Sequence, residues 1–195
     1  MNFLAHAFLS GDDPEMLVGN FMGDFVKGKQ FENYPDAISK GILLHREIDY
    51  YTDNHPLVEQ SKIKLRPNFG HYAPVVVDIF YDHLLVNNWH LYSSIAVQKF
   101  ISNVYNIVDQ HFEILPERLQ MIFPNIKNNN WLYHYGYFEG VKRSLAGMSR
   151  RSRFQPELQR AIMELENFYQ DFTNEFNGFF PDVIAFVKSY LENKR

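Results

Sequence analysis

Apolar residues along this chain recur mostly at intervals of three and four and seldom alternate strictly with polar residues. Such spacing places apolar side chains on one face of a helix, whereas strict alternation is typical of a half-buried strand. The pattern therefore predicts an all-α protein. Pro, Gly, Asn and Asp punctuate it and suggest helices near residues 2–10, 14–22, 36–52, 56–65, 73–88, 93–112, 116–122, 131–147, 155–176 and 180–193.

Length and composition narrow the class of protein. A chain of 195 residues is the usual size of one domain, so we expect a single helical domain over residues 1–195. Hydrophobic residues make up 46% and charged residues 22%, which excludes a disordered chain. The absence of cysteine excludes a disulfide scaffold, a thiolate metal site and a cysteine nucleophile. Any metal ion must then be held by His, Asp or Glu.

The net charge of −4 argues against a surface given over to nucleic acid, which would be strongly basic. No run of about 18 uninterrupted apolar residues is present, and no basic region precedes the first apolar residues. We therefore expect a cytoplasmic protein whose partners are neither nucleic acids nor membranes.

The segment 72–87, YAPVVVDIFYDHLLVN, carries apolar residues on every side of its predicted helix. A helix of this kind is buried on most sides. It nevertheless contains Asp78, Asp82 and His83, and an unpaired carboxylate in an apolar interior costs several kcal/mol. Asp78 and Asp82 lie one helical turn apart and repel one another, so a divalent metal ion or an arginine is expected beside them.

A second segment, GILLHREIDYYTDNHP over 41–56, has the same character, because His45 and Asp49 share one face of an otherwise apolar helix. Arg46 is a ready partner for these carboxylates, and a buried Arg46–Asp78 salt bridge is the purely structural alternative. His6 and Asp24 also lie in apolar surroundings, where an isolated histidine is more often a hydrogen-bonded core residue than a ligand.

The chain lacks a Walker-type loop, a GxSxG elbow and an HExxH motif, which removes three common classes of enzyme. Oxygen and imidazole ligands without sulfur favour Mg²⁺ or Mn²⁺ over zinc or iron. The residues alone leave open whether these groups serve a metal, acid–base chemistry or a structural ion pair.

Several segments occur in an order that resembles a known family: MNFLAHAFLS, GNFMGDFVKG, YPDAISKGILLHREIDYYTDNHP, APVVVDIFYDHLLVNNW and LAGMSRRSRF. Together they resemble the acyl carrier protein phosphodiesterases, a branch of the HD-domain-like phosphohydrolases. The resemblance is collinear over most of the chain and densest in residues 1–90. It implies an HD-like helical bundle and metal-dependent hydrolysis that releases 4′-phosphopantetheine from holo acyl carrier protein. Mn²⁺ is the expected cofactor, with Mg²⁺ or Fe²⁺ as alternatives.

The resemblance also implies residue roles. A divalent ion is expected on His6, Asp24, Asp78 and Asp82. The catalytic groups are expected to be His45, Arg46, Asp49 and His83, with Arg46 holding the phosphate and a histidine serving the leaving oxygen or the nucleophile. HD proteins generally carry an adjacent His-Asp pair, whereas here Asp24 follows Gly23 and the neighbouring pair is Asp82-His83. The choice of ligands within this set therefore stays open.

Carrier proteins of this kind are acidic, so the resemblance implies a local basic surface. One candidate is the loop of Arg150, Arg151 and Arg153 with Arg143. The other is Lys27 and Lys29, extended by Lys62, Lys64 and Arg66.

Two other functions are compatible with these residues. The scaffold could hydrolyse a nucleotide or another small phosphodiester, because a fold and a metal site do not fix the substrate. A non-catalytic module could instead bind an acidic partner, with the buried His and Asp residues forming only a polar network.

Overall fold

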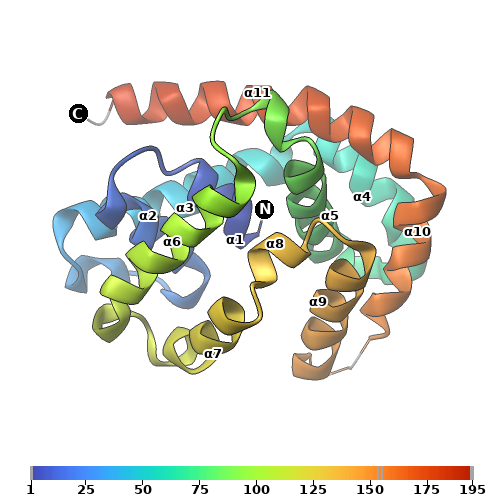
Figure 1. Ribbon diagram of the computed structural model, residues 1–195. Coiled ribbons are helices and arrows are strands. Elements are labelled where there is room, and N and C mark those ends of the chain that lie inside the picture. The colour runs from blue at the N-terminus through green and yellow to red at the C-terminus, as the bar shows by residue number, and fades with distance from the viewer. Residues whose placement is uncertain (1, 153, 155, 194–195) are drawn as a thin grey trace.

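The structure is a computed structural model that describes residues 2–152, 154 and 156–193, and it contains helices and no strand within these ranges (Figure 1). The prediction of an all-α fold is therefore confirmed. The α-helices are α1 (Phe3–Phe8), α2 (Pro14–Phe21), α3 (Asp36–Asn54), α4 (Pro56–Phe69), α5 (Ala73–Asn87), α6 (Val97–Gln110), α7 (Glu117–Asn128), α8 (Trp131–His134), α9 (Phe138–Arg151), α10 (Ile162–Asn167) and α11 (Tyr169–Asn193). Short 3₁₀ turns, among them η1 (Gly23–Phe25) and η2 (Gln30–Asn33), connect them.

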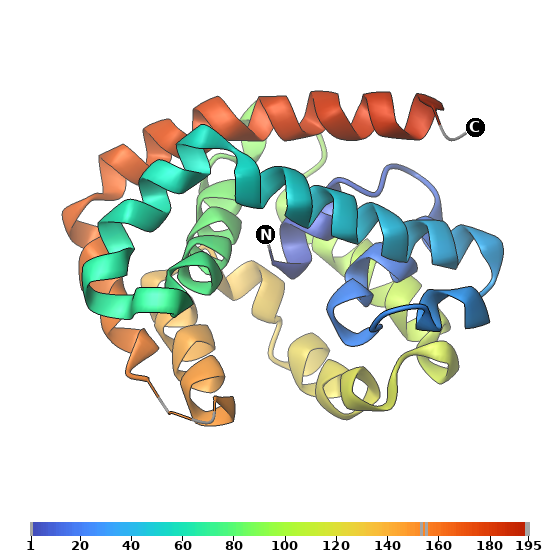
Figure 2. The same ribbon diagram turned by 180° about the vertical axis from the view of Figure 1, so that it is seen from behind.

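The long helix α11 lies along the top of the molecule, and α1 lies near its middle (Figure 1). Seen from behind, α3 and α4 cross the molecule below α11, and both helices contact it (Figure 2). Helix α2 packs against α3, and α5 packs against α1, α4, α9 and α11. The buried apolar residues of these helices form a single hydrophobic cluster. None of the described helices has the length and apolar character needed to cross a lipid bilayer.

Helix α5 runs through this core, as its lack of a polar face predicts. Its buried residues include Ile79, Phe80 and Leu84, and they also include Asp82 and His83. Phe80 meets Phe172 of α11 edge to face, with ring centroids 5.2 Å apart. Two polar side chains are thus enclosed by an aromatic core and require partners there.

The C-terminal boundaries differ from those that the sequence predicts. A break near residues 176–180 was expected because of Pro181, but this proline lies inside the continuous helix α11, and the break falls at Phe168. Proline removes one helical hydrogen bond, yet Phe179, Phe180 and Val183 are fully buried around it. The burial of this apolar face outweighs the tendency of Pro181 to end a helix, so the predicted helix end at residue 176 is wrong.

The predicted helix over 131–147 is divided into α8 and α9 by a turn at residues 135–137. Each part buries its own apolar residues: Leu132 and Tyr135 at the first, Val141 and Leu145 in the second. One straight helix would not place both groups against the core.

Helices α2 and α3 approach one another at two glycines. A Cβ atom on Gly19 would lie 2.1 Å from the backbone oxygen of Ile38, and one on Gly41 would lie 2.3 Å from that of Met16. Real side chains do not tolerate such distances, so the contact requires glycine on both helices. It brings the backbone of α2 within hydrogen-bonding reach of side chains on α3.

Helix α1 is held at its N-terminus by a carboxylate from α5. The amides of Leu4 and Ala5 donate to the two oxygens of Asp82, at 2.9 and 3.2 Å. Burial raises the pKa of Asp82 to about 7, although these amide hydrogen bonds act in the opposite direction. Asp82 therefore satisfies free amides of the first turn and fixes α1 against the core.

We expect Asp82→Ala to lower the free energy of unfolding by about 2–4 kcal/mol, because it leaves buried amides without an acceptor. Urea unfolding would measure the change. Asp109→Ala is the matched control, since Asp109 forms a half-exposed ion pair with Lys127, and it should cost less than about 1 kcal/mol. Equal stability of Asp82→Ala and the unchanged protein would contradict this role of Asp82.

Candidate functional site

Two histidines and two carboxylates converge between α1, η1 and α3. Nε2 of His6 lies 3.1 Å from one oxygen of Asp49, and Nε2 of His45 lies 3.1 Å from the other. Asp24 places an oxygen 3.3 Å from the same His45 nitrogen. The imidazole rings of His6 and His45 are stacked, with centroids 3.9 Å apart. We call these four residues, His6, Asp24, His45 and Asp49, the His/Asp cluster.

The cluster has a buried side and an open side. The histidine side chains are 1% and 5% exposed, whereas Asp49 is 37% and Asp24 67% exposed. The imidazole rings are therefore fixed in the protein, and the carboxylates face a region that a substrate can reach.

Asn20 of α2 orients both rings. Its amide NH₂ donates to the backbone oxygen of His6 at 2.9 Å and to the hydroxyl of Ser10 at 3.0 Å. Its side-chain oxygen consequently faces Nδ1 of His6, 2.8 Å away, while its backbone oxygen lies 2.8 Å from Nδ1 of His45. Both partners are acceptors, so each Nδ1 carries a proton and each Nε2 points toward the carboxylates.

Gly23 supports the same arrangement from the other side of His45. A Cβ atom at this position would lie 2.2 Å from Cγ of the imidazole ring. The sequence Gly23-Asp24 thus lets the ring of His45 pack on the backbone while the next residue reaches its Nε2.

The electrostatic balance of the cluster is negative. Burial lowers the pKa of His6 to about 4, so this ring is neutral at neutral pH. Burial would also lower the pKa of His45, but its hydrogen bonds to Asp24 and Asp49 raise it to about 9. Burial opposes ionisation of both carboxyls, yet the hydrogen bonds from His45 lower the pKa of Asp24 and of Asp49. Two negative charges and one positive charge leave a net negative site.

This donor set fits a divalent cation. With its proton on Nδ1, neutral His6 directs a lone pair from Nε2 at a carboxylate oxygen of Asp49, and a cation between them would convert that repulsion into attraction. The facing atoms of His6, His45 and Asp49 lie within 4.8 Å of one another, and no other such group occurs among the residues that the structure describes. The Asn20 contacts to the outer ring nitrogens resemble the support that metal-binding histidines usually have.

Other predicted site residues lie outside the cluster. Asp82 binds the amides of α1, as described above. Nδ1 of His83 donates to the backbone oxygen of Tyr135 at 2.7 Å, and its ring stacks on Phe138. Burial raises the pKa of Asp78, whose surroundings also include the negative charge of Asp49, but its oxygens are not within the group of facing ligand atoms.

Arg46 also points away from the cluster. Its guanidinium donates to the backbone oxygen of Val26 at 3.0 Å and lies 5.2 Å from the ring centroid of Phe31. It therefore fastens the chain after η1 to helix α3.

The predicted basic residues divide into two groups. Three of them are neutralised within the fold: Lys62 pairs with Asp53, Lys64 with Glu175 and Arg66 with Glu59. The others described are exposed, namely Lys27, Lys29, Arg143, Arg150 and Arg151. Arg153 lies outside the described residues.

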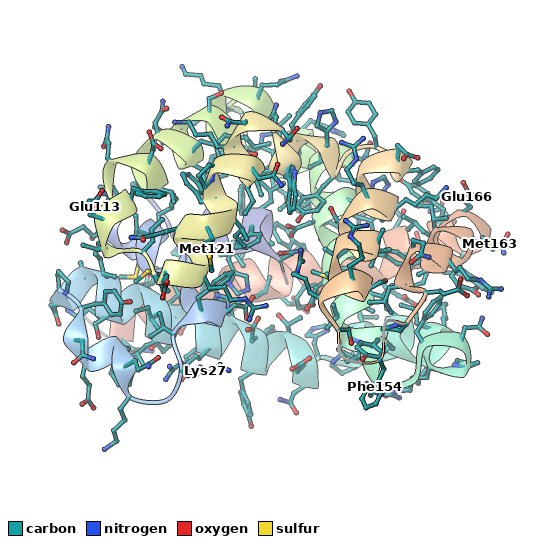
Figure 3. All side chains as sticks on the ribbon, turned by 90° about the horizontal axis from the view of Figure 1, so that it is seen from below. Lys27, Glu113, Met121, Phe154, Met163 and Glu166 are labelled. Atoms are coloured by element: carbon teal, nitrogen blue, oxygen red, sulfur yellow. The ribbon has the colours of Figure 1, made fainter. Side chains whose placement is uncertain are left out.

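Lys27 and Arg151 line a cavity of about 410 Å³ that borders the His/Asp cluster, because Asp24 belongs to both. Arg118 of α7 lines it as well, with Trp131 and Tyr135 on a further side. Arg143 lies in a neighbouring hollow that shares Trp131 and Ser144 with this cavity. Figure 3, seen from below, labels Lys27 near the loop that follows η1, Met121 on α7 and Phe154 beyond the end of α9.

Sequence reasoning missed Asn20, Arg118 and Trp131. Asn20 is fully buried and is a polar residue within the apolar segment LVGNFMG, which is the pattern that identified His6 and Asp24. Arg118 and Trp131 interrupt no apolar pattern and gave no comparable signal.

Comparison with known proteins identifies the family of this chain. The sequence profile of the family described as "Acyl carrier protein phosphodiesterase" matches residues 1–183. A protein of that name from Photorhabdus laumondii is 33% identical over 195 residues, which covers 100% of this chain and 96% of the relative. Another from Enterobacter sp. (strain 638) is 30% identical and covers 97% of this chain and 98% of the relative. No solved structure matches the chain.

The fold and the site together define a class of protein: a helical domain with a His/Asp cluster beside a cavity that basic residues line. Within that class, the chain belongs to the acyl carrier protein phosphodiesterase family. The resemblance read from the sequence is thereby confirmed, and the matched range includes every residue of the cluster.

NMR can test whether the hydrogen bond to Asn20 keeps the proton of neutral His6 on Nδ1. We expect Asn20→Ala to shift neutral His6 toward the form protonated on Nε2, because that proton would then donate to Asp49. Long-range ¹H–¹⁵N correlation spectra distinguish the two forms. Asn88→Ala, which removes only a contact to the backbone of Leu84, should leave His6 unchanged. Protonation of Nε2 in the unchanged protein would contradict the assignment.

Proposed function

We propose that this chain is a phosphodiesterase that hydrolyses the bond between 4′-phosphopantetheine and a serine of holo acyl carrier protein. The observation that carries the proposal is the family match over residues 1–183, which includes the complete His/Asp cluster and the cavity beside it. The names of the relatives supply the substrate, and the open carboxylate side of the cluster supplies a place for its phosphodiester.

In this reaction a water oxygen forms a bond to phosphorus, and the bond between phosphorus and the serine oxygen breaks. The serine oxygen takes up a proton, which leaves apo carrier protein and free 4′-phosphopantetheine. The partly exposed carboxylates of Asp24 and Asp49 face the region where the phosphodiester and water must meet.

We further propose that a divalent metal ion is the cofactor, with Mn²⁺ the first candidate and Mg²⁺ or Fe²⁺ as alternatives. His6, Asp24 and Asp49 are the residues suited to hold it, together with His45 once its Nε2 has given up its proton to make room for the ion. Such an ion stabilises charge on a phosphoryl oxygen and makes water more acidic. Asn20 holds both imidazole rings with Nε2 inward, so little reorganisation is needed when a ligand binds.

The protein partner is proposed to bind at the basic residues around the cavity. Lys27 and Arg151 line it, Lys29 follows Lys27 in the exposed loop, and α9 also carries the exposed Arg143 and Arg150. An acidic carrier protein would be attracted to such a surface even though the chain as a whole is negative. Salt should therefore weaken the interaction.

We expect Asp49→Asn to lower the release of phosphopantetheine at least about 100-fold, because one carboxylate faces both histidines. Mass spectrometry of the carrier protein measures the release. Asp53→Asn is the control from the next turn of α3, where the carboxylate pairs with Lys62, and it should retain activity. Full activity of Asp49→Asn would contradict the site, and turnover of small phosphodiesters without cleavage of holo carrier protein would contradict the proposed substrate.

Removal of metal ions provides an independent test. Treatment with a chelator should abolish the release of phosphopantetheine, and readdition of Mn²⁺ should restore it more fully than Mg²⁺. The same treatment of His45→Ala should leave nothing to restore, since this variant lacks a ligand. Undiminished activity after complete removal of metal would exclude the cofactor.

A further inference from the structure

The cavity beside the His/Asp cluster has positive side chains without negative partners. Arg118 of α7, Arg151 of α9 and Lys27 of the loop after η1 all line it, as does Asp24. Among the described residues, no carboxylate forms an ion pair with any of these three cations. Asp24 is the one acidic residue among the described residues that line the cavity, and it already contacts His45.

Arg118 and Arg151 also lie close enough to influence one another. Burial, followed by the positive charge of Arg118, lowers the pKa of the Arg151 guanidinium. Two guanidinium groups that face one cavity from different helices repel each other unless an anion lies between them. Their planar forks match the oxygens of a phosphate, which can accept two parallel hydrogen bonds from each.

The remaining walls suit an elongated, mostly uncharged group. Trp131, Ile122 and Met148 contribute apolar surface, and the largely buried ring of Tyr135 also borders the cavity. The volume of about 410 Å³ falls within the usual range for sites that enclose small organic ligands, about 300–1,000 Å³. A phosphate joined to a flexible amide chain combines both of these requirements.

We propose that this cavity is the subsite for the phosphopantetheine arm, with Arg118 and Arg151 binding its phosphate and Trp131 and Met148 lining the path of its amide chain. This inference rests on the proposed function and adds to it two residues, Arg118 and Trp131, for which the sequence gave no signal. Because Asp24 borders both regions, a phosphate held by the arginines is adjacent to the His/Asp cluster.

Binding of the reaction product tests the subsite separately from turnover. Titration of the full chain with 4′-phosphopantetheine should change tryptophan fluorescence, because Trp131 lines the cavity whereas Trp89, the other tryptophan, is buried elsewhere. Trp131→Phe should remove the signal without abolishing binding measured by calorimetry. Pantetheine, which lacks the phosphate, should bind at least about tenfold more weakly than the product.

The arginines are tested by Arg118→Ala and Arg151→Ala. Each should weaken 4′-phosphopantetheine binding about tenfold and raise KM for holo carrier protein, while pantetheine binding changes little. Lys142→Ala removes a positive charge from the exposed face of α9 outside the cavity and is the matched control. All three residues are exposed, so thermal unfolding should confirm an intact fold.

The outcomes separate this inference from the proposed function. If the unchanged chain cleaves holo carrier protein, but both arginine variants keep its product affinity and KM, the subsite is refuted and the proposed function stands. If no turnover occurs, yet both substitutions weaken binding of the phosphorylated arm, the subsite is supported and the proposed reaction is refuted. Equal affinity for pantetheine and its phosphate ester would overturn the role of the arginines.

Discussion

The geometry of the candidate site depends on Asn20, whose side-chain oxygen and backbone oxygen each accept a hydrogen bond from one histidine. Its amide group cannot rotate without losing the contacts to Ser10 and the backbone of His6, so the acceptor remains directed at the ring. The backbone contact to His45 exists because Gly19 and Gly41 let α2 and α3 approach closely. The side chain of Asn20 thus determines which nitrogen of His6 faces the carboxylates, and the packing of two backbones determines it for His45.

The cluster divides its electrostatic requirements between two environments. The imidazole rings are buried and fixed, whereas Asp24 and Asp49 retain contact with solvent. Burial of the rings favours a neutral His6, while the carboxylates keep His45 charged. Full burial of all four groups would raise the cost of the negative charge, and full exposure would weaken its attraction for a cation. The observed intermediate exposure suits the divalent ion and the phosphodiester that we propose for this site.

Much of the fold and part of the site could be predicted from the sequence. Apolar spacing identified the helical class, and the lack of a polar face identified α5 as buried. His6, Asp24, His45 and Asp49 were all found as polar residues in apolar segments, and the structure brings them together. The same signal also selected Asp82 and His83, because an interruption of an apolar helix is identical whether the partner is a ligand or a backbone amide. Only the three-dimensional packing separates these cases.

Other features depend on contacts distant in sequence. Pro181 predicts the end of a helix, but it lies inside α11 because the phenylalanines around it are buried. Arg118 becomes a candidate site residue only because α7 and α9 line the same cavity. A solvent-exposed arginine on a predicted helix is ordinary until its neighbours are known. The spacing of residues in the sequence therefore does not distinguish Arg118 from an ordinary surface arginine.

The separation of cluster and cavity along the chain has an evolutionary consequence. The His/Asp cluster is drawn entirely from residues 6–49, whereas the arginines and the tryptophan of the cavity come from residues 118–151. Substitutions in α7, α8 or α9 can reshape this wall of the cavity while leaving Asn20 and its two histidines undisturbed. Relatives with this architecture can therefore diverge in the shape and charge of the cavity while they retain the same His/Asp cluster.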